Sequence, residues 1–503
     1  MFGPRERSQL LSLFGSLFIV CLLLCGIASA APSITLSRKS GPPTSGIRVS
    51  GRGFAPNVGV DIFFDTKDEV LVVTNDKGEF HDAGAYAPRG AHPGKHWVTA
   101  LERNNDKGAQ EPFLVQTDWD QFHFDPQRLG VNPYENVLSP KTVHNLQLKW
   151  SYTTVGGSAS SPVVVDGVVY VGSGNGSVYA LKAASGELLW SYSTQSGIFS
   201  APAVADGMVY FGSFDNNVYA LDARTGKKVW EFATGRQVQA DATVVNGTVY
   251  IGSYDGKLYA LNAKTGAKRW GFDTSFPVID APAVADGVVY LGSNNGYVYA
   301  LDAQTGSQLW SYFATYYGVS FGPTVANGIV YVGASLGPIA LNAETGALLW
   351  SYFTPNPVFS ATSVVNGVVY FGATDFNVYA LNAYTGAKLW SYKTGASVYF
   401  SSPAVANGVV YIGSYDDKVY ALDARNGAFL WDYVTGDWVD SSPSVANGMV
   451  YVGSDDSNLY AFSLGHSDRR NRQGSVRPDL RTLRPDFNLK MSKPDATPSR
   501  AEL

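Results

Sequence analysis

The sequence has 503 residues, of which 45% are hydrophobic and 16% are charged, and its formal net charge is −5 at pH 7. The charged fraction is low against the ~25% of a typical soluble protein, so Ser, Thr, Asn and Gly are expected to supply much of the polar surface. The negative net charge argues against nucleic acid as a partner.

The first thirty residues have the organisation of an export signal. Arg5 and Arg7 precede an apolar run over Leu10–Ile27, and Ala28-Ser29-Ala30 offers a small-residue cleavage site. The sequence therefore predicts a signal peptide over residues 1–30 and an extracytoplasmic protein, whether periplasmic, cell-surface or secreted. The apolar run is long for a signal peptide, which leaves an uncleaved membrane anchor as the alternative.

Both cysteines, Cys21 and Cys25, lie inside this segment. Cleavage would leave a mature protein without cysteine. Disulfides, a thiol nucleophile, cysteine-ligated zinc, iron–sulfur clusters and covalently attached c-type haem are then all excluded.

Residues 31–117 are predicted to form a separate small β domain. Short alternating segments are separated by Gly, Pro and Asp turns, a pattern typical of strands. The predicted strands are Ile34–Ser37, Gly46–Phe54, Val60–Phe64, Glu69–Asp76 and Lys95–Glu102. Their number and length favour an immunoglobulin-like (Ig-like) β-sandwich, which could act as a spacer or as a ligand-binding module.

Residues 118–147 form a connector that is expected to pack on the domain after it. Trp119, Phe122 and Tyr134 supply aromatic side chains for such packing. The histidines of this stretch, His123 and His144, are isolated in the sequence, so packing or surface roles are favoured over metal binding.

Residues 148–464 repeat with a period of 40, which indicates an architecture of stacked identical units. The repeating tryptophans are Trp150, Trp190, Trp230, Trp270, Trp310, Trp350, Trp390 and Trp431. One unit runs from Ser200 to Gly235 and contains four apolar segments separated by turns, of which Asp206-Gly207 is a preferred hairpin turn. Each unit therefore predicts one four-stranded antiparallel blade of a β-propeller.

Eight Val-Tyr pairs after such hairpin turns, from Tyr170 to Tyr451, predict eight blades, but the last blade ends at Tyr460-Ala461-Phe462 with no tryptophan after it. The missing strand is predicted to come from the front of the repeat region, over Leu148–Tyr152. Such a closure would leave no open sheet edge in the ring. The tryptophans and the aromatics two residues after them would share one strand face and form the contacts between blades.

From Gly465 the repeat stops. Residues 465–503 contain nine Lys/Arg and five Asp/Glu with several prolines and little apolar content. This composition predicts a disordered basic tail.

The motif Ala-x-Asp/Asn-x-x-Thr/Ser-Gly-x-x-x-Trp, as in Ala220–Trp230, resembles the tryptophan-docking motif of the pyrroloquinoline-quinone-type (PQQ-like) β-propellers. The resemblance covers residues 148–464 and implies an all-β, eight-bladed propeller. The family includes quinoprotein alcohol dehydrogenases and outer-membrane-assembly scaffold lipoproteins, so the resemblance leaves the activity open. Its dehydrogenases use an adjacent-cysteine disulfide, Ca²⁺ and long insertions between blades, and the mature chain here offers neither the cysteines nor the room.

Candidate ligand-binding residues come from positions near the start of the innermost strands, where the eight units differ from one another. Variation among copies of a repeat frees such positions from the shared structural task, and aromatics with a few carboxylates and amides suit a sugar, a peptide strand or a quinone. The predicted channel-mouth residues are Phe199, Arg236, Gln237, Gln239, Asp241, Asp280, Tyr316, Tyr317, Tyr399, Phe400, Trp438 and Asp440.

Three functions are carried forward. The favoured one is a non-catalytic extracytoplasmic binding or scaffold protein, monomeric, whose propeller loops meet a protein or glycan partner. It needs no cofactor, no catalytic residue and no metal. The second is a PQQ-dependent alcohol or sugar dehydrogenase, which would need PQQ with Ca²⁺. The third is a scaffold for outer-membrane β-barrel assembly.

Overall fold

The computed structural model describes residues 31–157, 160–319, 321–465 and 475–486. The predicted signal peptide, residues 1–30, lies outside the described residues. The described residues divide into two compact units, one formed by residues 31–88, 94–115 and 475–486, the other by residues 89–93 and 116–465. Among the described residues, no helix is both long and apolar enough to cross a membrane.

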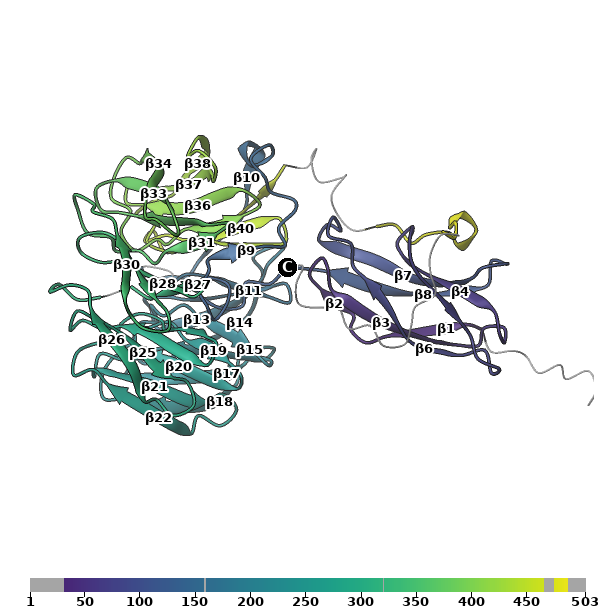
Figure 1. Cartoon of the computed structure of the whole chain (residues 1–503), viewed down its shortest axis with the longest axis horizontal. Coiled ribbons are helices and arrows are strands. Elements are labelled where there is room, and N and C mark those ends of the chain that lie inside the picture. Colours follow the sequence, from purple (N-terminus) through teal and green to yellow (C-terminus); the bar gives the residue numbers. More distant parts are fainter. Residues whose placement is uncertain (1–30, 158–159, 320, 466–474, 487–503) are drawn as a thin grey trace, which may run out of the picture. The chain divides into compact units, whose positions relative to one another are not determined.

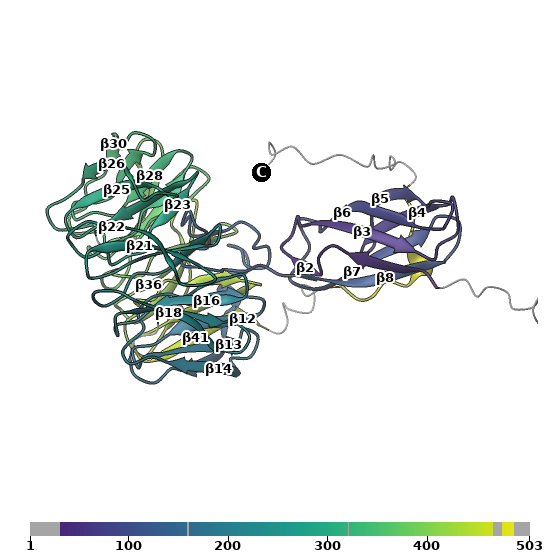
Figure 2. The same cartoon turned by 90° about the horizontal axis from the view of Figure 1, so that it is seen from below.

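The first unit consists of two β-sheets (Figures 1 and 2). One sheet has the order β1 (Ser33–Leu36), β3 (Gly46–Arg52), β6 (Phe80–Tyr86). The other has the order β2 (Ser40–Gly41), β8 (Gly108–Val115), β7 (Gly94–Glu102), β4 (Gly59–Phe64), β5 (Lys67–Val73). Alternate residues of β3, among them Ile47 and Val49, are buried while their neighbours are exposed, as expected for a strand with one face on a core. Two such sheets are compatible with the predicted Ig-like sandwich, and that assignment stays a prediction.

The prediction of a disordered tail is wrong for residues 475–486, which pack on this first unit. Ser475 N donates to Lys95 O at 2.7 Å, and the short 3₁₀ helix η2 (Leu480–Thr482) is followed by Leu483, which is only 3% exposed. Leu483 packs against Phe63 and Leu101. Leu480 also packs against this cluster, a contact that the polar composition of the segment does not reveal. The remainder of the predicted tail, 466–474 and 487–503, lies outside the described residues.

The second unit is a β-propeller of antiparallel sheets, which confirms the predicted all-β propeller fold (Figure 1). Eight sheets are present among the described residues, and each contains four strands from the repeats. The innermost strand of each blade contacts the innermost strand of the next blade, and the last contacts the first, so the ring is closed.

The strand bounds, from the innermost to the outermost strand of each blade, are as follows. Blade 1 has β11 (Val163–Val165), β12 (Val168–Gly172), β13 (Ser177–Lys182) and β14 (Leu188–Ser193); blade 2 has β15 (Ala203–Ala205), β16 (Met208–Gly212), β17 (Asn217–Asp222) and β18 (Lys228–Ala233). Blade 3 has β19 (Thr243–Val245), β20 (Thr248–Gly252), β21 (Lys257–Asn262) and β22 (Lys268–Asp273); blade 4 has β23 (Ala283–Ala285), β24 (Val288–Gly292), β25 (Tyr297–Asp302) and β26 (Gln308–Phe313). Blade 5 has β27 (Thr324–Ala326), β28 (Ile329–Val332), β29 (Ile339–Asn342) and β30 (Leu348–Ser351); blade 6 has β31 (Ser363–Val365), β32 (Val368–Gly372), β33 (Asn377–Asn382) and β34 (Lys388–Lys393). Blade 7 has β35 (Ala404–Ala406), β36 (Val409–Ser414), β37 (Lys418–Asp423) and β38 (Phe429–Val434); blade 8 has β39 (Ser444–Ala446), β40 (Met449–Gly453), β41 (Asn458–Leu464) and β10 (Leu146–Thr153).

The hairpin turns between the first two strands of each blade explain the recurring Asp-Gly and Asn-Gly pairs. In blade 2, Asp206 has φ 49° and Gly207 has φ 74°. Positive φ at both central positions defines a type I′ turn, which matches the twist of the strands it joins.

The ring is closed by the strand that the sequence assigns to this task. Strand β10, which follows the 3₁₀ helix η1 (Val143–Asn145), pairs antiparallel with β41, with Trp150 opposite Ala461. The outermost strand of blade 8 therefore comes from the start of the repeat region and the other three from its end.

The repeated tryptophans lie between neighbouring blades. Trp190 Nε1 donates to Ala223 O of the next blade at 2.9 Å, and the Tyr170 hydroxyl donates to the same carbonyl at 3.2 Å. The Trp190 ring lies against Gly226, where an added Cβ would come within 2.6 Å of the ring. The same Trp-to-carbonyl bond links the other blades through Trp150, Trp230, Trp270, Trp310, Trp350, Trp390 and Trp431.

Candidate functional site

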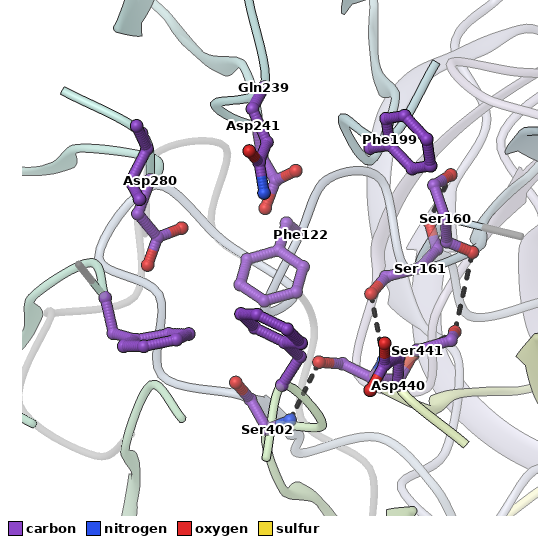
Figure 3. Close-up of a pocket in the computed structure, with 14 residues that line it drawn as sticks. Phe122, Ser160, Ser161, Phe199, Gln239, Asp241, Asp280, Ser402, Asp440 and Ser441 are labelled. Carbon is purple, nitrogen blue, oxygen red and sulfur yellow. Dashed lines mark hydrogen bonds between the residues drawn. The ribbon is translucent and has the colours of Figure 1, made fainter. Parts of the chain in front are cut away.

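A cavity of ≈ 260 Å³ lies in the central channel of the propeller (Figure 3). Its residues come mainly from the segments that lead into the innermost strands, because these segments converge on the axis of the ring. The lining residues are Phe122, Ser160, Ser161, Phe199, Gln239, Asp241, Ile279, Asp280, Phe321, Phe400, Ser402, Asp440, Ser441 and Ser442. This set is called the channel cavity below.

The connector runs along the inside of the ring and hydrogen-bonds one blade after another. Val204 N of blade 2 donates to Asp120 O at 2.7 Å, and Val405 N of blade 7 donates to Gly130 O at 2.8 Å. Between these, the connector accepts further bonds from the amides of Val244, Val284, Val325 and Val364. An innermost strand has a free edge, and the connector satisfies N–H groups that would otherwise be buried without an acceptor. Strand β9 (Val131–Asn132) extends this pairing beside β35.

This route places Phe122 in the cavity wall, where connector side chains support its ring. The His123 ring stacks on Phe122 with centroids 4.5 Å apart, and the Arg128 guanidinium lies 4.5 Å from the Phe122 centroid. Burial lowers the pKa of His123 to about 3, so this imidazole is neutral at physiological pH.

Serine side chains organise one structural layer of the channel. Gly212 N donates to Ser200 Oγ at 3.2 Å, and the equivalent bond ties the serine to the second strand in four other blades. Those serines are Ser160, Ser360, Ser401 and Ser441. Blades 3, 4 and 5 depart from this pattern and carry Ala240, Asp280 and Phe321 at the same position.

Arg128 enters the channel beside these three blades. Its side chain is 1% exposed, and its Nη1 donates to Ala281 O. Arg128 Nη2 lies 3.9 Å from Asp241 Oδ2, and Nη1 lies 3.9 Å from Asp280 Oδ1. Gly322 leaves room for the guanidinium, since a Cβ there would come within 2.6 Å of Arg128 Nη1. Two carboxylates thus face one buried cation.

Asp440 lies elsewhere on the cavity wall, in blade 8, and none of the ion pairs found among the described residues involves it. The pKa of Asp440 is raised to about 7, mainly by burial; a hydrogen bond from Tyr415 opposes the rise, and the nearby Asp455 and Asp437 contribute to it. Burial also raises the pKa of Asp241 and of Asp280, and Arg128 opposes both shifts. The cavity therefore contains three acidic groups, and burial makes the ionised form of each less stable than it is in water.

The remaining walls are apolar and aromatic. Phe122, Phe199, Phe321 and Phe400 all line the cavity, and the Phe321 and Phe400 centroids are 5.9 Å apart. Behind Phe400, the Tyr399 ring packs edge-on at 4.5 Å. Carboxylates and phenyl rings thus line the same cavity.

Six of the twelve residues predicted at the channel mouth line this cavity: Phe199, Gln239, Asp241, Asp280, Phe400 and Asp440. The other six lie outside its lining: Arg236, Gln237, Tyr316, Tyr317, Tyr399 and Trp438. Tyr316 and Tyr317 are 91% and 81% exposed, because the longer loop before β27 carries them outward. Trp438 is 48% exposed and stacks on Tyr415 at 4.5 Å.

The sequence prediction missed Phe122, Arg128 and Phe321. Phe321 occupies the serine position of blade 5, and comparison of the repeats marks it as a departure. Phe122 and Arg128 belong to the connector, which has no second copy in the chain for comparison.

Solved structures with this architecture include proteins of different kinds. BamB from Moraxella catarrhalis aligns with a TM-score of 0.54 and 20% identity over 63% of this chain and 99% of that chain. Quinohemoprotein alcohol dehydrogenase ADHIIG from Pseudomonas putida HK5 aligns with a TM-score of 0.61 and 18% identity over 76% and 82%. The computationally designed Ika8 protein aligns with a TM-score of 0.58 and 21% identity over 63% and 99%. At these identities the likeness shows the fold.

The residues of the channel cavity do not fit pyrroloquinoline quinone. The quinone is a tricarboxylate, whereas the described lining carries three aspartates and no lysine or arginine. Arg128 lies outside the lining and is already faced by Asp241 and Asp280. Among the described residues, no three His, Cys, Asp or Glu side chains are grouped so that they could hold a metal ion.

The protein-family model described as outer membrane protein assembly factor BamB matches the chain four times, over residues 144–237, 214–317, 315–402 and 393–485. Together the four matches span the whole propeller. None of the curated proteins compared with the chain matches it. The chain belongs to the PQQ-like β-propeller family of outer membrane protein assembly factor BamB.

Proposed function

We propose that this protein is a non-catalytic binding or scaffold protein that works outside the cytoplasm and receives part of its partner at the channel mouth. The observation that carries the proposal is the charge of the channel cavity, where Asp241, Asp280 and Asp440 are gathered without a basic side chain in the described lining. Such a cavity repels the anionic quinone on which the dehydrogenase alternative depends. Binding to a partner needs no cofactor.

An aromatic pair next to Asp440 supports a protein or glycan as the partner. Trp438 and Tyr415 stack with an interplanar angle of 6°, and Trp438 remains 48% exposed. A flat aromatic surface beside a carboxylate, here Asp440, suits a sugar ring or a polypeptide segment. The Ig-like domain would then act as a spacer.

A scaffold role in outer-membrane β-barrel assembly is the second candidate. It is favoured by the family match and by the alignment with 99% of the BamB chain from Moraxella catarrhalis. This role predicts that the protein co-purifies with outer-membrane insertion machinery from the cells that make it.

Reconstitution with the quinone tests the proposal. Protein beginning at residue 31 is mixed with pyrroloquinoline quinone and Ca²⁺, and quinone binding is followed by absorbance while alcohol and sugar oxidation is followed with an electron-accepting dye. We expect neither binding nor turnover, because the lining carboxylates repel the quinone. A quinohemoprotein alcohol dehydrogenase serves as the positive control. Reproducible turnover by this protein would overturn the proposal.

A further inference from the structure

We propose that the channel cavity binds an organic cation, an ammonium or guanidinium group on an apolar stem, as carried by a lysine or arginine side chain of a polypeptide partner. This inference rests on the proposed function, because it takes the cavity to be the binding site. It adds the chemical class of the group that enters.

The first argument is the charge balance of the cavity. Arg128 lies 3.9 Å from one oxygen of Asp241 and 3.9 Å from one oxygen of Asp280, so two carboxylates share one guanidinium. Each carboxylate also accepts a backbone amide, Asp241 from Ala201 N at 2.6 Å and Asp280 from Gly322 N, but these neutral donors leave one negative charge in excess of the guanidinium. Asp440, in blade 8, adds a further acidic group to the wall. With all three carboxyls ionised, the cavity keeps a net negative charge that a single entering cation would reduce.

The second argument is the apolar wall. The phenyl rings of Phe199, Phe321 and Phe400 line the same space as the three aspartates, together with Phe122. Aromatic faces attract cations through their quadrupole, and the attraction grows when the cation is removed from water. The rings also give an alkyl stem an apolar surface, as long cationic side chains require.

The third argument concerns the size of the cation. Among the described residues, no group of three acidic, histidine or cysteine side chains is arranged to hold a metal ion. The carboxylates are instead distributed around a space of ≈ 260 Å³. Separated carboxylates with phenyl rings between them suit a cation that has several N–H donors and an apolar body.

The site should respond to pH. Because burial raises the pKa of Asp440 to about 7 and also raises that of Asp241, protonation below this range removes the charges that attract a cation. The groups that face these carboxyls are Arg128 and Asp280 for Asp241, and Tyr415, Asp437 and Asp455 for Asp440. Affinity for a cation is therefore expected to rise between pH 5.5 and pH 8.5.

Calorimetric titration with three probes tests the inference: a blocked pentapeptide with one central lysine, the same peptide with norleucine, and 1,5-diaminopentane. We expect the lysine peptide to bind at pH 8.5 and the norleucine peptide, which lacks only the charge, to bind at least about tenfold more weakly. If the diamine binds and the lysine peptide does not, the cavity is still a cation site, but its ligand is a free amine and not a peptide side chain. Equal binding of the lysine and norleucine peptides, or no binding of any probe, would overturn the inference.

Matched variants locate the binding. Asp440→Asn keeps the shape of the side chain and should weaken the lysine peptide about tenfold at pH 8.5, with a smaller effect at pH 5.5. Phe400→Leu should weaken it about two- to fivefold, the worth of one cation–π contact. Asp206→Asn is the control, since Asp206 lies at the far end of β15 and Asn246 adopts the same positive φ in blade 3. Unchanged affinity in Asp440→Asn would place the peptide elsewhere and refute the site.

The quinone reconstitution separates the two failures. Quinone-dependent turnover would overturn the proposed function and this inference together. Absence of quinone binding combined with no preference for lysine would overturn this inference alone.

Discussion

At the scale of single residues, the channel cavity contains carboxyl groups whose ionised form is destabilised by burial, so an uncharged side chain in their place would make the folded protein more stable. Folding raises the pKa of Asp440 from 3.8 to about 7, with burial as the main cause. The folded state therefore binds the proton more tightly than the unfolded chain does. Ionisation of Asp440 therefore lowers the free energy of unfolding. The loss is small near pH 3.8, the unfolded pKa, and grows as the pH rises towards about 7.

Asp440→Asn is accordingly expected to stabilise the propeller at pH 8.5 and to have almost no effect at pH 4. A gain of one kcal/mol would raise the melting temperature of a large domain by about 2–4 °C. Thermal unfolding followed by circular dichroism at the two pH values measures this difference. Asp206→Asn, with the same charge change at an exposed turn, should leave the melting temperature unchanged at both, and an equal shift at both pH values in Asp440→Asn would contradict the argument.

Residue identities near the cavity could be predicted only where the repeats allow comparison. Asp241, Asp280 and Asp440 stand out because no other blade carries an acidic residue at the same position. Arg128 could not be found in this way, since its contacts with blades 3 and 4 connect residues more than 100 positions apart. Sequence spacing in a connector without a second copy carries no information about such contacts.

At the scale of elements, the contact between each tryptophan and the glycine of the next blade sets the spacing of the blades. Gly226 has φ 70° and would place a Cβ 2.6 Å from the Trp190 ring, whereas Gly207 has φ 74° with nothing within 4 Å of its Cβ position. Alanine at either position would have to adopt a positive φ, which destabilises the folded state by about 1–2 kcal/mol. Only Gly226→Ala also forces the tryptophan ring away.

Gly226→Ala should therefore destabilise the propeller by clearly more than Gly207→Ala does. The midpoint of chemical unfolding, followed by tryptophan fluorescence, compares the two variants directly. Equal midpoints would mean that backbone conformation alone accounts for the glycine and that the ring contact contributes nothing.

The same elements show why the blades were predictable and the connector was not. A blade is built from neighbouring strands, so turns such as Asp206-Gly207 and the 40-residue period contain nearly all the information needed. The route of the connector depends on bonds such as Val284 N to Pro126 O, which cross more than 150 residues. Hydrogen bonds of that range leave no periodic trace in the sequence.

At the scale of the whole molecule, the first unit is assembled from both ends of the chain. Asp486 N donates to Asp68 Oδ2 at 2.7 Å, and the Pro478 carbonyl accepts from Gln110 Nε2 at 2.9 Å. Composition predicted a solvated end for this segment because prolines and charges outnumber its apolar residues. Leu483 nevertheless has a place in the core formed by Phe63 and Leu101.

Leu483→Ala should destabilise the first unit by about 2–5 kcal/mol, the usual cost of truncating a buried leucine. Thr482→Ala, at the exposed neighbouring position, should cost little. Differential scanning calorimetry of the full chain would show a transition that moves down in Leu483→Ala while the propeller transition stays in place. A thermogram identical to that of the unaltered protein would show that the packing of Leu483 does not stabilise the first unit.

Ring closure has to wait until both of the strands that it joins have been synthesised. Strand β10 is made early, but the β41 residues that it pairs with follow some 300 positions later. Until the ribosome has added Asn458–Leu464, blade 8 lacks its third strand and β10 has no edge to join. A chain interrupted anywhere before that point carries a bare strand that invites association with other chains. Export of the finished polypeptide before folding would avoid this hazard, because both halves of the closure then reach the same compartment together.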